Sequence, residues 1–365
     1  MKEIGSLTRL LLLVALAAGG AACGEPEGTD AALTPAEAQA LVQRRPRPPE
    51  VIFGRVAEFD LPLPPDGNFS RFPAQIAPGR GDELWFRDQY AELGHITKHG
   101  NEISFVAAPA GLGIALGSDG NVWFGTQSGI ARLTHSGAID EFALPDVGGP
   151  QDLVAGHDGN LWALGFDHVA RVTTEGVATS FAMPTPSSSS GDHMALGPDG
   201  AVWFTNRGMN LLGRVTPAGA ITEFAIGAGG ALFGIAGGDD GTVWFTRQGG
   251  NPGENSIGHL TRRGVASTVV QLPDSTTTLP NPPNGMPMAL AAGRDGNMYF
   301  TTYFELEDNY IGQVSEAGCL TKFDIPTGGA ASFGITAGRS GTLWFTEIFN
   351  NSIGRLNVTG GPTVR

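Results

Sequence analysis

Apolar and polar positions alternate in short runs along most of the chain, and from residue 72 these runs return in the same order. The clearest copies occupy residues 114–124, 153–163, 194–204 and 235–245. In each copy an apolar run leads through an Asp-Gly pair to a second apolar run that contains tryptophan. Alternation with a period of two predicts β-strands, and an Asp-Gly pair between two such runs predicts a tight hairpin.

The pattern occurs seven times, because weaker copies lead to Trp85, Tyr299 and Trp344. All six tryptophans hold the same repeat position, and Tyr299 holds it in the seventh copy. A glycine-ended turn between two more short strands follows in most copies, as in residues 212–224. Seven repeats of four strands predict an all-β, seven-bladed β-propeller, and the 55 glycines among 365 residues agree with so many turns. We expect the tryptophans to be wedges between neighbouring blades.

The two ends of the repeat region complement each other. The seventh copy stops after its third strand, at residues 352–357, whereas residues 56–62 repeat the fourth-strand phrase found at residues 139–145. The N-terminal strand is therefore predicted to complete the last blade, which closes the ring and removes an exposed sheet edge. We expect one propeller domain over residues 51–365 rather than two domains.

The first 50 residues have a different composition. Residues 1–22 combine Lys2 and Arg9 with a short apolar run and small residues, as in a signal peptide. Cys23 directly follows Gly-Ala-Ala, which resembles the lipobox of bacterial lipoproteins, so Cys23 is the predicted lipidation site and residues 23–50 a flexible tether. We expect an exported lipoprotein of the bacterial cell envelope, or a secreted or periplasmic protein if Cys23 is not lipidated.

Charge and cysteine content exclude several classes of function. The formal net charge of −14 argues against nucleic acid as a partner, because binding along nucleic acid requires a basic surface. Two cysteines are too few for a disulfide framework or a cysteine-based zinc site. We expect a monomer that contacts a membrane only through a lipid anchor on Cys23.

Candidate binding residues lie on one predicted face of the ring. Tight glycine turns occupy one face, so the links between blades and the loops after the second strands share the other, here called the variable face. The residues predicted to bind a ligand there are Gln151, Asp192, His193, Arg207, Arg247 and Glu347. Phe233, Met288 and Phe333 are predicted to lie on the inner rim of the same face. His193 can be a structural residue or a functional one, and the sequence leaves both open.

Three motifs near the C-terminus begin at Gly334 (Gly-Ile-Thr-Ala-Gly), Leu343 (Leu-Trp-Phe-Thr-Glu) and Ser352 (Ser-Ile-Gly-Arg-Leu). These motifs resemble those of the virginiamycin B lyase, or streptogramin lyase, family, and the resemblance extends over about residues 56–357. The resemblance implies the seven-bladed fold. It also implies a carbon–oxygen lyase that opens a cyclic depsipeptide by β-elimination with magnesium and a histidine base.

The resemblance places the family's tyrosine, histidine and glutamate groups at the starts of innermost strands. The matching positions in this chain are Ala74, Met288, Ala331 and Phe333, which offer neither an imidazole nor a carboxylate. An elimination at these positions would lack its proton acceptor and its charge stabiliser. We therefore expect this chain to share the fold of the family but not its chemistry.

Two functions remain open at this point, beside a mainly structural role. The favoured one is a non-enzymatic propeller at the cell envelope that binds a small molecule, peptide or glycan on the variable face. The alternative is a lyase-like enzyme, of the streptogramin B type, that carries out metal-dependent β-elimination with a rearranged site. Magnesium is expected as a cofactor only under the alternative.

Overall fold

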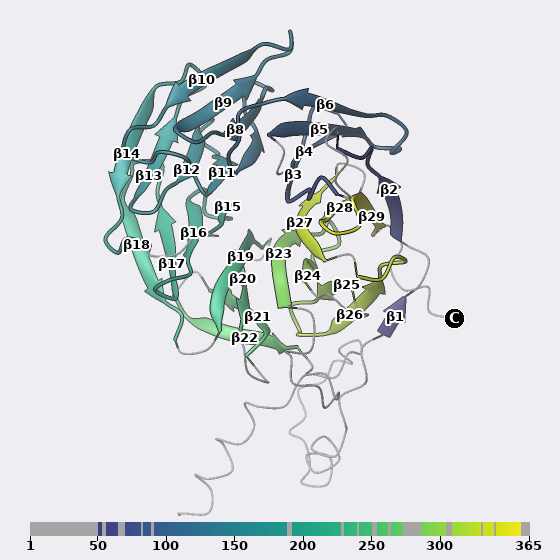
Figure 1. The fold of residues 1–365 in the computed structure, drawn as a ribbon. Coiled ribbons are helices and arrows are strands. Elements are labelled where there is room, and N and C mark those ends of the chain that lie inside the picture. Colours follow the sequence, from purple (N-terminus) through teal and green to yellow (C-terminus); the bar gives the residue numbers. More distant parts are fainter. Residues whose placement is uncertain are drawn as a thin grey trace, which may run out of the picture.

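The computed structural model describes residues 50–52, 56–64, 70–81, 83–88, 91–187, 192–227, 230–238, 241–249, 254–261, 264–272, 286–303, 309–329, 331–338 and 341–358. The predicted signal peptide, Cys23 and the tether lie outside these ranges. The described residues form seven β-sheets arranged in a ring around a central axis, as Figure 1 shows. The seven-bladed propeller is thus confirmed. Within the described ranges there is no helix that could cross a membrane.

Each blade has four antiparallel strands, and in blades 1 to 6 these four run in chain order from the axis to the outside. Blade 1 contains β3 (Gln75–Pro78), β4 (Glu83–Arg87), β5 (Glu92–Thr97) and β6 (Ile103–Ala107). Blade 2 contains β7 (Ile114–Leu116), β8 (Val122–Gly125), β9 (Gly129–Leu133) and β10 (Ile139–Ala143). Blade 3 contains β11 (Asp152–Ala155), β12 (Leu161–Leu164), β13 (His168–Val172) and β14 (Ala178–Ala182). Blade 4 contains β15 (Met194–Leu196), β16 (Val202–Asn206), β17 (Leu211–Val215) and β18 (Ile221–Ala225).

The last three blades follow the same plan. Blade 5 contains β19 (Ala231–Gly237), β20 (Val243–Gln248), β21 (Ser256–Leu260) and β22 (Ala266–Gln271). Blade 6 contains β23 (Met286–Ala292), β24 (Met298–Tyr303), β25 (Tyr310–Val314) and β26 (Leu320–Asp324). Blade 7 contains β27 (Ser332–Ala337), β28 (Thr342–Glu347) and β29 (Ser352–Asn357), and its fourth strand is β2 (Val56–Asp60).

The closure strand β2 joins the two ends of the chain. It pairs antiparallel with β29 from Val56 opposite Leu356 to Asp60 opposite Ser352, so the predicted closure is confirmed. A short additional strand, β1 (Glu50–Ile52), pairs in parallel with the outer strand β26 of blade 6. The sequence pattern did not predict β1, because three residues are too few to show an alternation.

The Asp-Gly turns of blades 2, 3, 4 and 6 position the tryptophan or tyrosine of the following strand as well as reversing the chain. The indole Nε1 of Trp123 donates a hydrogen bond to Asp119 at 3.1 Å, and Trp203 donates to Asp199 at 3.2 Å. The hydroxyl of Tyr299 donates to Asp295 in the same way, at 2.8 Å. The aspartate of the turn therefore anchors the aromatic side chain that follows it.

The hydrophobic core is divided among the interfaces between blades. Each of its seven clusters combines residues of two adjacent blades and contains one of the six tryptophans or Tyr299. Trp162 of blade 3, for example, packs with Met194, Val202 and Phe204 of blade 4. The prediction that these aromatic residues are wedges between blades is confirmed.

The outer strands add a second set of contacts between blades. In blade 2 the rings of Trp123 and Phe142 stack with centroids 5.3 Å apart, and the guanidinium of Arg132 lies over both rings. Arg132 also donates to the carbonyl oxygen of Thr174 in blade 3 at 2.7 Å. Arg171 and Arg355 make the equivalent contact with the next blade, so the arginine of the third strand fastens neighbouring sheets.

A glycine-to-alanine change tests how tightly the sheets are packed. A Cβ atom at Gly213 would overlap the ring of Phe204, whereas Gly328 has open space and an ordinary φ. Overpacking a core costs about 1–3 kcal/mol, so Gly213→Ala should lower the free energy of unfolding by about 3 kcal/mol in urea titrations. Gly328→Ala should change it by less than about 0.5 kcal/mol. Equal effects of the two changes would contradict this packing.

Candidate functional site

The starts of the innermost strands are held together by a set of threonines. The hydroxyl of Thr246 donates to the carbonyl oxygen of Met288 in the next blade at 2.9 Å. The Thr301 and Thr346 hydroxyls make the same bond to Phe333 and Ala74, at 2.7 Å and 2.9 Å. Ala74, Met288 and Phe333 therefore occupy equivalent places, where the strands of blades 1, 6 and 7 enter the mouth of the ring.

Aromatic side chains form an arc at this mouth. The rings of His193 and Phe233 are 4.6 Å apart between centroids. The ring of Phe333, two blades further on, meets Phe233 edge to face at 5.7 Å. Met288 of the intervening blade is buried, and the side-chain amide of Gln248 donates to its sulfur. Blades 5 to 7 thus contribute an apolar part of the rim.

A carboxylate orients the imidazole at the other end of the arc. Nδ1 of His193 lies 3.3 Å from Oδ2 of Asp152, and the same oxygen accepts the backbone N–H of Met194 at 2.9 Å. The other carboxylate oxygen accepts the N–H of Leu153 at 2.8 Å. Because an ionised carboxylate can only accept, the proton of a neutral His193 ring belongs on Nδ1, which leaves a lone pair on Nε2. Nε2 is buried and has no hydrogen-bond partner within the described ranges.

Asp192 anchors a loop and does not point into the mouth. It is 1% exposed, and its carboxylate accepts hydrogen bonds from the hydroxyl of Ser187 and, at 2.6 Å, from the backbone N–H of Arg207. Its own N–H donates to the side chain of Gln151 at 3.3 Å. Burial raises the pKa of Asp192 above its ordinary value, against the effect of these bonds. Asp192 and Gln151 therefore tie the links before blades 3 and 4 together.

The two predicted arginines lie in different places. The guanidinium of Arg207 lies 5.4 Å from the ring centroid of Phe233, so it adds a cation to the aromatic arc. Arg247 instead donates to the carbonyl oxygen of Ile226 in the link before its own blade, and burial lowers its pKa. Arg207 is thus a member of the mouth, whereas Arg247 supports a link between blades.

Glu347 is fully buried at the end of β28. One of its carboxylate oxygens accepts a hydrogen bond from the hydroxyl of Ser352 at 2.8 Å. The structure therefore brings four of the six predicted residues, Gln151, Asp192, His193 and Arg207, to blades 3 and 4, and places Glu347 by itself in blade 7.

Sequence reasoning missed Asp152 as a member of the site. Its signal was present, because Asp152 and His193 hold the same repeat position, directly before Leu153 and Met194. Residues at the same position in adjacent blades lie next to each other at the mouth. A comparison of equivalent positions would have paired these two side chains.

The rim does not fit a magnesium site. Within the described ranges no three His, Cys, Asp or Glu side chains come close enough together to hold a metal ion. The carboxylates of Asp152 and Asp192 are both occupied by backbone and hydroxyl donors. Magnesium prefers carboxylate and water oxygens in near-ideal octahedral geometry, which these side chains do not offer.

Comparison with known proteins agrees with the fold. The sequence profile of the virginiamycin B lyase family matches residues 51–278 and 149–363. The chain belongs to the virginiamycin B lyase family. The structure of virginiamycin B lyase from Staphylococcus aureus is 27% identical with a TM-score of 0.69, over 83% of this chain and 98% of that one.

Two further virginiamycin B lyases also resemble this chain. A catalytically inactive virginiamycin B lyase from Staphylococcus aureus with quinupristin is 28% identical with a TM-score of 0.68, over 83% of this chain and 98% of that chain. The virginiamycin B lyase of Nocardia farcinica is 26% identical over 165 residues, which are 45% of this chain. That alignment spans about half of the relative's own length, 50%.

The loop anchored by Asp192 gives a direct test of the site's construction. Asp192→Ala leaves the N–H of Arg207 and the hydroxyl of Ser187 without their buried acceptor, which should lower the free energy of unfolding by about 3 kcal/mol. The exposed Asp146, in a neighbouring link, provides the control, because Asp146→Ala should change stability by less than about 0.5 kcal/mol. Chemical denaturation of both variants measures the difference. If Asp192→Ala were as stable as Asp146→Ala, Asp192 would not anchor this loop.

Proposed function

We propose that the protein is a ligand-binding propeller of the cell envelope. Its variable face would take an apolar or aromatic group that carries a hydrogen-bond donor. The observation that carries the proposal is the arc of His193, Phe233 and Phe333, which combines an aromatic surface with an oriented imidazole at one end. A small molecule or a peptide side chain fits this description better than a charged substrate does.

The apolar part of the rim supports binding without catalysis. Ala74, Met288 and Phe333 hold the equivalent strand starts of blades 1, 6 and 7, which the family resemblance links with its working groups. None of these side chains can exchange a proton near neutral pH. Burial of an aromatic ligand against the partly exposed Phe333, which packs edge to face on the buried Phe233, would supply binding free energy at about 25 cal/mol per Å² of apolar surface.

The polar end of the arc supports selectivity. Nε2 of His193 is a buried acceptor without a donor among the described residues. A buried polar atom without a partner costs about 1–3 kcal/mol, so a ligand that displaces the rim side chains and donates a hydroxyl or amide N–H to Nε2 would be preferred over an analogue without that donor. Asp152 supports this role by keeping the Nδ1 proton on the opposite side of the ring.

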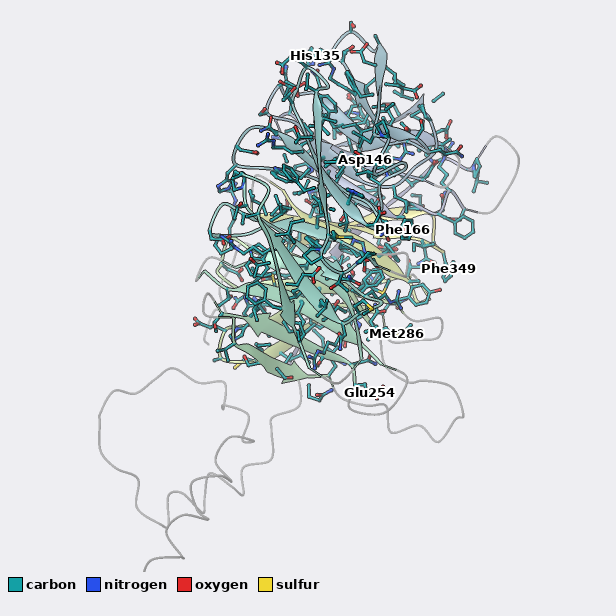
Figure 2. All side chains as sticks on the ribbon, turned by 90° about the vertical axis from the view of Figure 1, so that its left-hand side faces the viewer. His135, Asp146, Phe166, Glu254, Met286 and Phe349 are labelled. Carbon is teal, nitrogen blue, oxygen red and sulfur yellow. The ribbon has the colours of Figure 1, made fainter. Side chains whose placement is uncertain are left out.

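The variable face also carries exposed apolar side chains that a larger partner could cover. Phe166 and Met209, in loops after the second strands, are 47% and 50% exposed, and Leu112 near the mouth is 48% exposed. Figure 2 shows the ring from its edge, with Phe166 and Phe349 toward one side and His135, in a tight turn, toward the other. Exposed apolar side chains on one face favour a peptide or glycan partner beyond the mouth itself.

A lyase-like enzyme remains the second candidate, and one observation favours it. The geometry of Asp152 and His193 is that of an oriented general base, with a lone pair on Nε2. In a β-elimination that lone pair would take the α-proton while the carbon–oxygen bond breaks. The rim residues that the structure describes supply no carboxylate set for magnesium, so we prefer the first candidate.

Location and assembly complete the proposal. We propose that Cys23 carries a lipid that holds the propeller at the cell envelope, and that the protein acts there as a monomer. If Cys23 is not lipidated, the same propeller would be secreted or periplasmic. The net charge of −14 supports a partner other than nucleic acid.

Matched aromatic compounds test the proposed site. The full chain is titrated with p-cresol and with toluene, which differ by one hydroxyl, while ligand-observed NMR reports binding. We expect p-cresol to bind about tenfold more tightly, which corresponds to about 1.4 kcal/mol. His193→Phe should abolish the preference and keep toluene binding, because the new ring continues the aromatic arc.

The control is His135→Phe, in a tight turn on the opposite face, which should leave both affinities unchanged. Equal affinities for the two compounds in the wild-type protein would contradict the role of His193. Binding of neither compound would contradict the aromatic mouth as a whole.

A further inference from the structure

The residue three positions after the blade tryptophan, at the end of the second strand, differs between blades. In blades 4 and 5 it is a hydrogen-bond donor, and in blade 1 it is an acid whose charge an arginine neutralises. In blade 4 the side-chain amide of Asn206 donates to the carbonyl oxygen of Thr185 at 2.9 Å. In blade 5 Arg247 donates to the carbonyl oxygen of Ile226. In blade 1 the position holds Asp88, whose carboxylate is balanced by the buried guanidinium of Arg71 at 3.2 Å.

Blade 7 has Glu347 at this position, and no described basic side chain neutralises its charge. The side chain is fully buried, Oε2 accepts a hydrogen bond from the hydroxyl of Ser352, and Oε1 accepts no hydrogen bond of ordinary length from a described residue. No described Lys, Arg or His forms an ion pair with it. An isolated ionised carboxylate at such a place is strongly unfavourable, so the group becomes neutral.

The surroundings of Glu347 otherwise copy those of Asn206. In blade 4 both the N–H and the hydroxyl of Thr185 donate to the carboxylate of Glu223, at 3.0 Å and 2.6 Å. In blade 7 the N–H and hydroxyl of Thr327 donate to Glu58 in the same way, at 3.2 Å and 3.0 Å. Glu58 lies on the closure strand β2 opposite Gly354 of β29, and its carboxylate raises the pKa of Glu347 through its charge and as a hydrogen-bond partner.

We propose that Glu347 binds a proton at neutral pH and donates it to Glu58, forming a buried carboxyl–carboxylate hydrogen bond that fastens the closure strand to blade 7. In blade 4 the amide of Asn206 ties the link before the blade by donating to the carbonyl oxygen of Thr185, whereas in blade 7 the proton of Glu347 would tie the closure strand through the carboxylate of Glu58. This inference concerns the closure of the ring and does not depend on the proposed ligand-binding function.

A proton fits this place better than a metal cation does. Among the described residues of blade 7, the buried oxygens without a hydrogen-bond partner are Oε1 of Glu347 and the hydroxyl oxygen of Ser332, which lies opposite Glu347 in the β27–β28 pairing. Calcium takes about six to eight oxygen ligands and magnesium about six. Both oxygens of Glu58 already accept hydrogen bonds from Thr327. Two unpartnered oxygens are too few for either ion.

The charges around Glu347 set the direction of a pH effect. Burial raises the pKa of Glu347 to about 8, and the negative charge of Glu58 adds to the shift. Ser352 and Asn350 act in the opposite direction through hydrogen bonds, and no described group from β27, β28 or β29 brings a compensating positive charge. Above this pH two carboxylates would repel each other between β2 and the rest of blade 7.

The sign of the stability change follows from these values. The ordinary pKa is 4.5, so between pH 4.5 and 8 the folded protein holds a proton that the unfolded chain releases. Each rise of one pH unit in this window should lower the folding equilibrium constant by up to about tenfold. The contribution is fully present below pH 4.5 and is lost as the pH rises through 8.

Chemical denaturation of the full chain between pH 5.5 and 8.5 tests the inference. Glu347→Gln supplies a permanent donor, as Asn206 does, and should flatten the pH dependence. The ratio of its folding equilibrium constant to that of the wild-type protein should therefore rise by about a hundredfold between pH 5.5 and pH 8.5. Glu58→Gln should move the wild-type transition to lower pH, because the repelling charge is removed.

Asp60→Asn is the matched control, since Asp60 is an exposed carboxylate on the same strand, and it should keep the wild-type profile. A second readout is the infrared carbonyl band of a protonated carboxyl group at pH 7, which should disappear in Glu347→Gln and remain in Asp60→Asn. Parallel pH profiles of wild type and Glu347→Gln would overturn the inference. So would stabilisation by calcium at pH 7 that is lost in Glu347→Gln, which would indicate a bound cation.

Discussion

The fold depends on the packing of one aromatic side chain between each pair of neighbouring blades. Four strands cannot bury both of their faces by themselves, so each blade is stable only against its neighbours. Trp162 and its counterparts fill these interfaces, and the aspartate of the preceding turn anchors their polar atoms in four blades. The ring must therefore close, because an open end would expose one apolar sheet face. The pairing of β2 with β29 meets this requirement with a strand from the other end of the chain.

The candidate site follows from the same constraint. Closing seven twisted sheets around an axis brings seven strand starts together, and threonine hydroxyls such as that of Thr246 hold adjacent starts in register. Side chains distant in sequence then become neighbours, as with Asp152 and His193, or with Phe233 and Phe333. The mouth combines an oriented imidazole with an aromatic arc because each blade contributes a different residue at an equivalent place.

The sequence predicted most of the fold because repetition reveals it. Seven copies of one phrase determine the strand order, and the displaced fourth-strand phrase at residues 56–62 predicts the closure. The strand β1 could not be predicted, since its parallel pairing to β26 has no counterpart in the repeat. The pattern determines which positions repeat, but it carries less information about contacts made across the axis.

The candidate site was predicted less completely for the same reason. His193 was identified from its place at the start of an innermost strand and Arg207 from its place in the loop after a second strand, and both lie beside Phe233. Asp192 has the same polar character, but hydrogen bonds to Ser187 and Arg207 turn it into the loop. Glu347 ends a strand on the variable face and yet is fully buried. Which way a side chain turns depends on partners in other repeats, and a single repeat does not contain that information.

The most direct test of the central claim is whether this propeller converts the ligand found with its structural relative. The full chain is incubated with quinupristin and magnesium, and the products are separated by chromatography with mass detection. The account predicts an unchanged compound, since Ala74, Met288 and Phe333 provide no base and the described rim residues form no cluster of acids or histidines that could hold magnesium. A magnesium-dependent product of unchanged mass but shifted retention, lost in His193→Ala, would show elimination. That result would contradict the account and make His193 the base of a lyase.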